Sequence, residues 1–305
     1  MDWTVYWFML PVCTVIATTA MFSGISGAAL LTPTFLIGFP LFSVPRLTLT
    51  AAIGTSLFLE ASGFGTGLYR YFRMRLIDIQ TARSLILVTL PLGALGAILA
   101  RYAPAEALRL GYGVAMLGLA WLLLSDDDKG RRPKEGPAPL VVCQSEQSHS
   151  HCNKGEHRVL RAASGSVYDY CAHGLRLQRV ISGTGAVIAG MISTGVGEAT
   201  LPALVRRSRL PVPVAAATST VVVAGTVTGA AVTHLIQLTL EGGLSAIPWN
   251  LIVWAVPGSI LGAFLGTRLQ GRVNERLARY FFAALFAAIG VSFLLAFTVF
   301  ANRFG

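Results

Sequence analysis

Charged side chains are absent from long stretches of this chain, and those stretches indicate its fold class. The uncharged stretches cover residues 3–45, 84–100, 180–197, 242–267 and 280–302. A helix needs about 20 mostly apolar residues to cross a bilayer. The pattern therefore predicts an all-α polytopic membrane protein. The composition agrees, because 12% of the residues are charged, whereas about 25% are charged in a soluble domain.

Two apolar halves flank one polar segment, and the halves repeat each other. We expect a first transmembrane repeat over residues 1–124, a polar linker over 125–179 and a second repeat over 180–305. Three motifs recur in the same order, which indicates duplication, the usual construction of secondary transporters. The motifs are Gly24-Ile-Ser-Gly27 and Gly195-Val-Gly197, then Ala52-Ile-Gly-Thr55-Ser56 and Ala215-Ala-Ala-Thr218-Ser219, then Pro91-Leu-Gly-Ala-Leu-Gly96-Ala97 and Pro257-Gly-Ser-Ile-Leu-Gly262-Ala263.

Each half contains three candidate membrane spans behind one apolar segment that glycines interrupt. The spans are predicted at residues 48–69, 84–100, 108–124, 212–236, 249–267 and 280–301. The interrupted segments cover 3–38 and 180–204. If each is a hairpin that enters and leaves from one side, each half crosses the membrane three times, and the second half is inverted relative to the first. Residues 3–38 are also long enough for two full spans.

The distribution of Lys and Arg orients the chain. The inverted-repeat arrangement places four loops on one side, and they hold 20 of the 24 Lys and Arg residues. The loops are 70–83, 125–179, 205–211 and 268–279. Cytoplasmic loops are rich in Lys and Arg, so we expect a cytoplasmic linker in a protein of the cytoplasmic (inner) membrane. The same rule explains the net charge of +10. The expected partners are therefore lipid and a small anion rather than nucleic acid, and self-association stays open.

The two glycine motifs are candidate anion sites. A helix that breaks at membrane depth leaves backbone N–H groups that lipid cannot satisfy, so the break must line a cavity or be buried in protein. Such N–H groups and the helix dipole favour an anion. Close helix packing through small residues is the alternative. The predicted binding residues at the breaks are Ser26, Gly27, Thr194, Gly195 and Gly197.

A hydroxyl pair follows each break and extends the predicted site. The pairs Thr55-Ser56 and Thr218-Ser219 occupy corresponding positions in the two halves. Residues that correspond in this way are expected to line a site at the interface of the repeats. Their hydroxyl groups could instead bond to carbonyl groups of their own helices.

These motifs resemble those of the TauE/SafE sulfite-exporter family of membrane proteins. The resemblance rests on Gly24-Ile-Ser-Gly-Ala28 with Pro33, on the Ala-x-x-Thr-Ser element of both halves and on the Pro-x4-Gly-Ala helices. It covers about residues 20–124 and 180–300, and it implies a transporter of sulfite, sulfonates or related small sulfur oxyanions. The chain departs from the family pattern at Ser26 and Ala28, where glycine is frequent, and at Glu198, which replaces a further glycine.

Two carboxyl groups lie within apolar segments, where an ionisable residue is costly and indicates function. Glu60 lies inside the span 48–69 on the same helix face as Ser56, and Glu198 lies at the second break. An ionised carboxylate repels an anion, whereas burial favours the neutral acid. We therefore expect Glu60 or Glu198 to bind a proton together with the anion. Capping of a helix end or pairing with a buried Arg is the alternative.

Cysteine and histidine residues concentrate in the linker. This density of ligands suits Zn or Cu, although the spacing is not that of a known zinc finger. A polar, largely irregular loop with scattered His and Cys is the alternative. The predicted cytoplasmic position argues against stable disulfides. The candidate metal ligands are Cys143, His149, His151, Cys152 and His157.

Together these features favour a secondary active anion transporter, acting as an exporter, over an enzyme. The chain has no Gly-x4-Gly-Lys-Ser/Thr motif, so we expect no ATP hydrolysis and no cofactor apart from metal in the linker. A membrane-embedded enzyme would need a cluster of ionisable side chains, and the few present are spread over separate segments. A metal-responsive sensor acting through the linker is the other alternative, although a sensor has no need of two broken helices.

Overall fold

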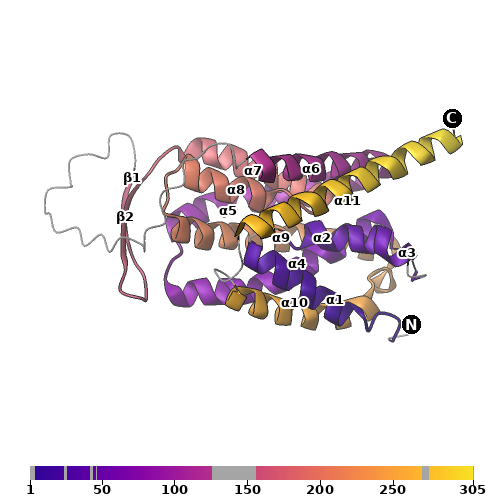
Figure 1. Cartoon of the computed structure of the whole chain (residues 1–305), viewed down its shortest axis with the longest axis horizontal. Coiled ribbons are helices and arrows are strands. Elements are labelled where there is room, and N and C mark those ends of the chain that lie inside the picture. Colours follow the sequence, from indigo (N-terminus) through magenta and orange to yellow (C-terminus); the bar gives the residue numbers. More distant parts are fainter. Residues whose placement is uncertain are drawn as a thin grey trace, which may run out of the picture.

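The computed structural model describes residues 4–23, 26–41, 44–45, 47–125, 156–269 and 275–304. Most of them form helices that run along one axis of the molecule (Figure 1). A β-hairpin lies at one end of that axis. The start of α1 (Met9–Ser23) and the end of α11 (Glu275–Phe304) lie at the other end.

Both halves of the chain begin with a broken helix and continue with three long helices. The first half forms α1, α2 (Ala28–Pro33), the π-helix η1 (Thr34–Gly38), α3 (Phe39–Leu41), α4 (Leu49–Met74), α5 (Ile79–Tyr102) and α6 (Ala105–Ser125). The second half forms α7 (Leu175–Ile192), α8 (Val196–Arg206), α9 (Val212–Gly242), the 3-10 helix η3 (Leu244–Ala246), α10 (Trp249–Leu269) and α11. The strands β1 (Glu156–Arg161) and β2 (Val167–Ala172) lie between the halves.

Four helices within the described ranges are long and apolar enough to cross a membrane. They are α5, α6, α9 and α10. This finding confirms the expectation of a helical multi-pass membrane protein. Each of the six predicted spans also coincides with one long helix, and most of these helices extend a few residues beyond the predicted limits.

Each glycine-interrupted segment forms a helix, a break and a shorter helical piece. After the first break, helical turns run without interruption from residue 28 to residue 41. After the second break, α8 has 11 residues. Both pieces are shorter than the roughly 20 residues of a full crossing. For residues 3–38, these lengths favour the hairpin over two complete spans.

Helices of the two halves exchange packing partners. α1 packs against α10 and α7 packs against α5, so the first helix of each half lies on a helix of the other half. α4 packs against α9, and α6 packs against α11. In these last two pairs, the partners occupy corresponding positions in the two halves.

Glycines of the Pro-x4-Gly-Ala motifs allow the exchanged helices to approach closely. A Cβ atom added at Gly96 would lie 2.2 Å from the backbone oxygen of Val187 on α7. One added at Gly262 would lie 2.4 Å from the backbone oxygen of Thr14 on α1. Small residues commonly allow membrane helices to approach each other this closely. The two motifs therefore hold α5 on α7 and α10 on α1.

The segment before α7 differs from the expected irregular loop. Strands β1 and β2 pair in antiparallel fashion over residues 156–172, with Arg158 opposite Tyr170. Gly165 lies in their connection with φ +86°, a conformation that glycine adopts readily. The irregular-loop prediction is therefore wrong here, because a valine in β1 and a valine with two tyrosines in β2 favour β-structure within a polar composition. Among the described residues, this hairpin is the departure from an all-helical chain, and α7 begins at Leu175 rather than at Val180.

Candidate functional site

A cavity of about 350 Å³ lies where the two glycine breaks meet. Ser26 contributes from the first break, Thr194 and Gly195 from the second, Glu60 from α4 and Ser219 from α9. The cavity thus draws residues from both halves of the chain. Five of the predicted binding residues line it, namely Ser26, Thr194, Gly195, Gly197 and Ser219.

The same cavity extends toward the end of the molecule that carries the β-hairpin. Tyr71, near the end of α4, and Val212, the first residue of α9, are among its lining residues. The hairpin contacts this end of α4, since the backbone N–H of Ala163 donates to the carbonyl of Met74 at 3.0 Å. Val212 is 56% exposed. The cavity therefore runs from the breaks toward the hairpin end.

At the first break, Glu60 accepts the hydrogen bonds that an anion was expected to accept. The hydroxyl of Ser26 donates to Glu60 Oε1 at 2.7 Å, and the backbone N–H of Gly27 donates to the same atom at 2.9 Å. Glu60 is buried. Its other oxygen, Oε2, has no hydrogen-bond partner within the described part of the chain.

At the second break, Glu198 lies in the first turn of α8 and joins the two halves. The backbone N–H of Gly195 donates to Glu198 Oε2 at 3.1 Å, which is one half of a capping box. The backbone N–H of Ser26 donates to Glu198 Oε1 at 3.2 Å. The break requires glycine at position 195, because φ there is +124°. One carboxylate therefore accepts a backbone N–H from each break.

A chain of buried hydroxyl groups, which the sequence did not indicate, connects α2, α4 and the second break. Thr32 Oγ1 lies 2.7 Å from the hydroxyl oxygens of both Ser56 and Ser193. Ser56 donates its one hydroxyl proton to the carbonyl of Ile53 at 2.9 Å. Thr32 must therefore donate to Ser56, and Ser193 to Thr32, because each hydroxyl has one proton. Ser193 also lines the cavity.

The remaining predicted binding residues lie away from the cavity wall. Gly27 borders a smaller void of about 30 Å³, which Glu60 borders as well. Thr55 is fully buried, and its hydroxyl has no partner among the residues described. Thr218 accepts a hydrogen bond from the backbone N–H of Asp78 at 3.1 Å. Ser56 donates to a carbonyl of its own helix, as does Ser219, which does line the cavity. A role in binding stays a prediction for all of them.

Carboxyl groups lie at the cavity without a cationic side chain in its described lining. Its described lining includes Glu60 but no Lys, Arg or His side chain, and Glu198 bonds to two of the lining residues. Two ionised carboxylates without a neighbouring cation would oppose the entry of an anion.

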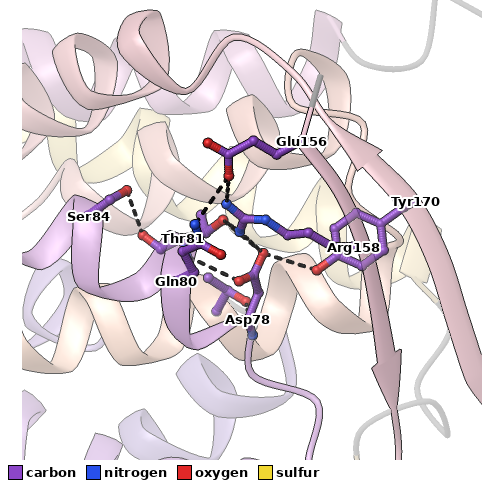
Figure 2. Close-up of polar contacts among 8 residues, drawn as sticks. Asp78, Gln80, Thr81, Ser84, Glu156, Arg158 and Tyr170 are labelled. Atoms are coloured by element: carbon purple, nitrogen blue, oxygen red, sulfur yellow. Dashed lines mark hydrogen bonds and ion pairs between the residues drawn. The ribbon is translucent and has the colours of Figure 1, made fainter. Parts of the chain in front are cut away.

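A second polar cluster fastens the β-hairpin to the helices (Figure 2). Asp78 caps α5, and its Oδ2 accepts hydrogen bonds from Arg158 Nη1 at 2.5 Å and from the Tyr170 hydroxyl at 3.0 Å. Glu156 bonds to the other terminal nitrogen of Arg158. Because the N–H of Asp78 binds Thr218, this cluster links the hairpin to α5 of the first half and to α9 of the second.

The Asp78 carboxyl group stays ionised more readily than usual. Burial alone would raise its pKa, but hydrogen bonds from the backbone and hydroxyl of Thr81, together with Arg158, outweigh burial and hold the pKa below its usual value. The pKa of Tyr170 is raised by burial and by the negative charge of Asp78. Sequence reasoning missed this cluster because Asp78 and Arg158 are 80 positions apart.

The metal site predicted in the linker stays a prediction. Cys143, His149, His151 and Cys152 lie outside the described residues, and the residues that are described contain no group of three or more His, Cys, Asp or Glu that could hold a metal. His157 Nε2 lies 2.8 Å from Asp169 Oδ1. Cys171 is disulfide-bonded, so the expectation of reduced linker cysteines is wrong for this residue.

Comparison with known protein families agrees with this architecture. The family model described as "Sulfite exporter TauE/SafE" matches residues 9–293. The chain belongs to the TauE/SafE family. The match confirms the resemblance seen in the motifs, and it makes the chain a membrane transporter of the sulfite-exporter type. No curated protein and no solved structure shows a significant match to this TauE/SafE protein.

Proposed function

We propose that this TauE/SafE protein is a secondary active transporter that exports small sulfur oxyanions, such as sulfite or organosulfonates, across the cytoplasmic membrane. The observation that carries the proposal is the cavity of about 350 Å³ that both glycine breaks line. Sites formed by broken helices at the interface of two repeats are typical of secondary transporters. The volume falls within the range of small-molecule sites.

Transport would proceed by alternating access to a site at the interface of two inverted repeats. The exchanged packing of α1 on α10 and of α7 on α5 supports a two-fold relation between the halves. The excess of Lys and Arg supports a cytoplasmic position for the linker and its hairpin, whereas the disulfide at Cys171 is more typical of a non-cytoplasmic segment. With that orientation, the cavity extends toward the cytoplasm, which is the side from which an exporter loads its substrate.

Proton coupling would resolve the conflict between the carboxylates and an anion. Glu60 Oε1 already accepts two hydrogen bonds, so Oε2, which has no partner in the described part of the chain, is the oxygen on which a proton would reside. A protonated carboxyl group loses its charge and gains an O–H donor. Protonation at Oε2 would thus remove the repulsion between Glu60 and the anion.

Counterflow in proteoliposomes tests the proposed substrate class. Vesicles loaded with unlabelled sulfite, sulfate, thiosulfate or a short sulfonate would be diluted into radiolabelled sulfite, with chloride-loaded and protein-free vesicles as controls. We expect sulfite or the sulfonate to accelerate uptake of label well above the chloride level. Equal uptake with every internal anion would contradict the proposal.

A further inference from the structure

The side chain of Glu198 occupies the position that the proposed function gives to the substrate. Its oxygens accept the backbone N–H of Gly195 at 3.1 Å and that of Ser26 at 3.2 Å. The capping box of α8 accounts for the first bond only. The second bond crosses to the other half of the chain, where capping of α8 does not require it.

Polar groups next to Glu198 have the chemistry to complete an oxyanion site. Thr194 lines the cavity with its side chain 2% exposed, and its hydroxyl has no partner in the described part of the chain. An anion that replaced the carboxylate would therefore meet two backbone N–H groups, and rotation of the neighbouring Thr194 side chain would add a hydroxyl donor. A carboxylate and a sulfur oxyanion both present paired, negatively charged oxygens, so each can accept from the same two N–H groups.

Neither Glu198 nor Glu60 has a carboxyl group at the corresponding position of the other half, although the two halves repeat each other. The third residue of α2, counted from its cap Gly27, is Leu30, whereas the third residue of α8 is Glu198. Likewise, the position of α9 that corresponds to Glu60 is Val223, since Thr218-Ser219 corresponds to Thr55-Ser56. A general need for capping at these breaks would place a carboxylate in both short helices. The asymmetry instead indicates a particular role for Glu198.

We propose that Glu198 is an internal competitor of the transported anion: its carboxylate bridges the two breaks in the empty protein, and the substrate displaces it into the adjoining cavity. The inference rests on the proposed function, and it adds a regulatory step to the same site. Displacement weakens binding, because the anion must break two hydrogen bonds to a carboxylate before it forms its own. It also aids release, because the returning carboxylate expels the anion.

Glu198→Gln tests this competition. The amide retains one acceptor oxygen, but its NH2 group cannot accept an N–H, so one of the two break N–H groups becomes available to an anion. Full-length wild-type and variant proteins in detergent would be titrated calorimetrically with sulfite, and with sulfate, at one pH and one ionic strength. We expect the Kd for sulfite to fall about tenfold, since a charge-assisted hydrogen bond no longer competes, and we expect a lower maximal counterflow rate.

Two further variants keep the test decisive. Glu198→Asp preserves the charge but shortens the side chain so that it cannot reach both N–H groups, and it should also lower the Kd. Glu106→Gln makes the same charge change at an exposed position of α6 and should leave the Kd unchanged. An unchanged or higher Kd in both Glu198 variants, with sulfite binding to wild type, would overturn this inference alone. Absence of oxyanion binding and of counterflow in every protein would overturn the proposed function with it.

Discussion

The hydroxyl of Ser26 donates a hydrogen bond to Glu60 Oε1 at 2.7 Å, although the two residues are 34 positions apart. The bond joins the first helix break to the middle of α4, and the neighbouring N–H of Gly27 strengthens it. The break therefore presents a carboxyl group to the cavity beside its backbone dipoles. Under the proposed function, anion entry depends on whether this carboxyl group is charged.

Glu60→Gln should make anion binding independent of protonation at this position. In wild type, ionised Glu60 opposes the anion and the neutral acid does not, so sulfite affinity should decrease as the pH rises. Gln resembles the neutral acid and should hold the anion at high pH. The measurement is Kd against pH for both proteins, corrected for the ionisation of sulfite itself. A wild-type affinity without further pH dependence would show that Glu60 is structural.

If the pH dependence survives in Glu60→Gln, the proton resides elsewhere. Glu198 is then the next candidate, because it is the other carboxyl group bonded to the breaks. The double variant Glu60→Gln/Glu198→Gln should abolish the dependence altogether. Glu106→Gln is again the matched control, and its pH profile should follow that of wild type.

Position 197 should tolerate a methyl group but not a large side chain. A Cβ atom at Gly197 would lie 3.5 Å from Val223 Cγ2, which is an ordinary contact. Gly197→Ala should therefore keep sulfite binding within a few-fold of wild type. Gly197→Leu should reduce binding below detection, because its branched side chain would fill part of the cavity that Gly197 lines. Equal affinities for Ala and Leu would show that this glycine serves packing only.

Arg158→Met should loosen the hairpin and destabilise the protein. Asp78 is 5% exposed, and removal of Arg158 leaves this buried carboxylate without a counter-ion, although Thr81 and Tyr170 still donate hydrogen bonds to it. Loss of one partner costs about 3 kcal/mol in comparable buried pairs. Arg161→Met, an exposed position on the same strand, should have little effect. Thermal unfolding of the purified protein measures both. A melting temperature for Arg158→Met equal to that of Arg161→Met would contradict a stabilising role for the pair.

A low pH should reduce the stability that Asp78 and its hydrogen-bond partners contribute to the folded protein. The pKa of Asp78 is lower in the folded protein than the value of about 3.9 for an unfolded chain. Its contribution to stability is therefore complete above that unfolded value and is lost as the pH falls through the folded pKa. Asp78→Asn should be less stable than wild type at neutral pH, and the difference should shrink at strongly acidic pH. A constant difference in melting temperature across this range would contradict the assignment.

Topology can be tested at two exposed turns. A peptide tag inserted after Ser164, in the hairpin, should be accessible only from the cytoplasm. A tag inserted after Gly243, at the far end of α9, should be accessible only from outside. Protection assays in intact cells and inverted vesicles distinguish the two sides. Tags that report the same side would contradict the inverted arrangement.

The sequence was informative about the long helices and the breaks, because both depend on local composition. Uncharged runs of helical length lead to helices wherever lipid leaves the backbone no other partner, and the two glycine motifs lie at real interruptions. The contacts made by Glu60 and Glu198 were not predictable, since each depends on how α4 and α8 approach residue 26. The hydroxyl chain through Thr32 was missed for the same reason: single Thr and Ser residues in apolar helices usually bond to their own backbone.

The exchanged packing of the helices has a mechanical consequence. Gly96 and Gly262 bring α5 onto α7 and α10 onto α1 at backbone contact, so separating either pair would lose close packing that small residues make possible. We therefore expect that a rocking motion does not divide the molecule at the linker into its N-terminal and C-terminal portions. In that case each rigid body combines helices encoded far apart, and we expect sliding at other interfaces, such as that between α4 and α9. Covalent cross-links between α5 and α7 should thus spare turnover, whereas links between α4 and α9 should arrest it.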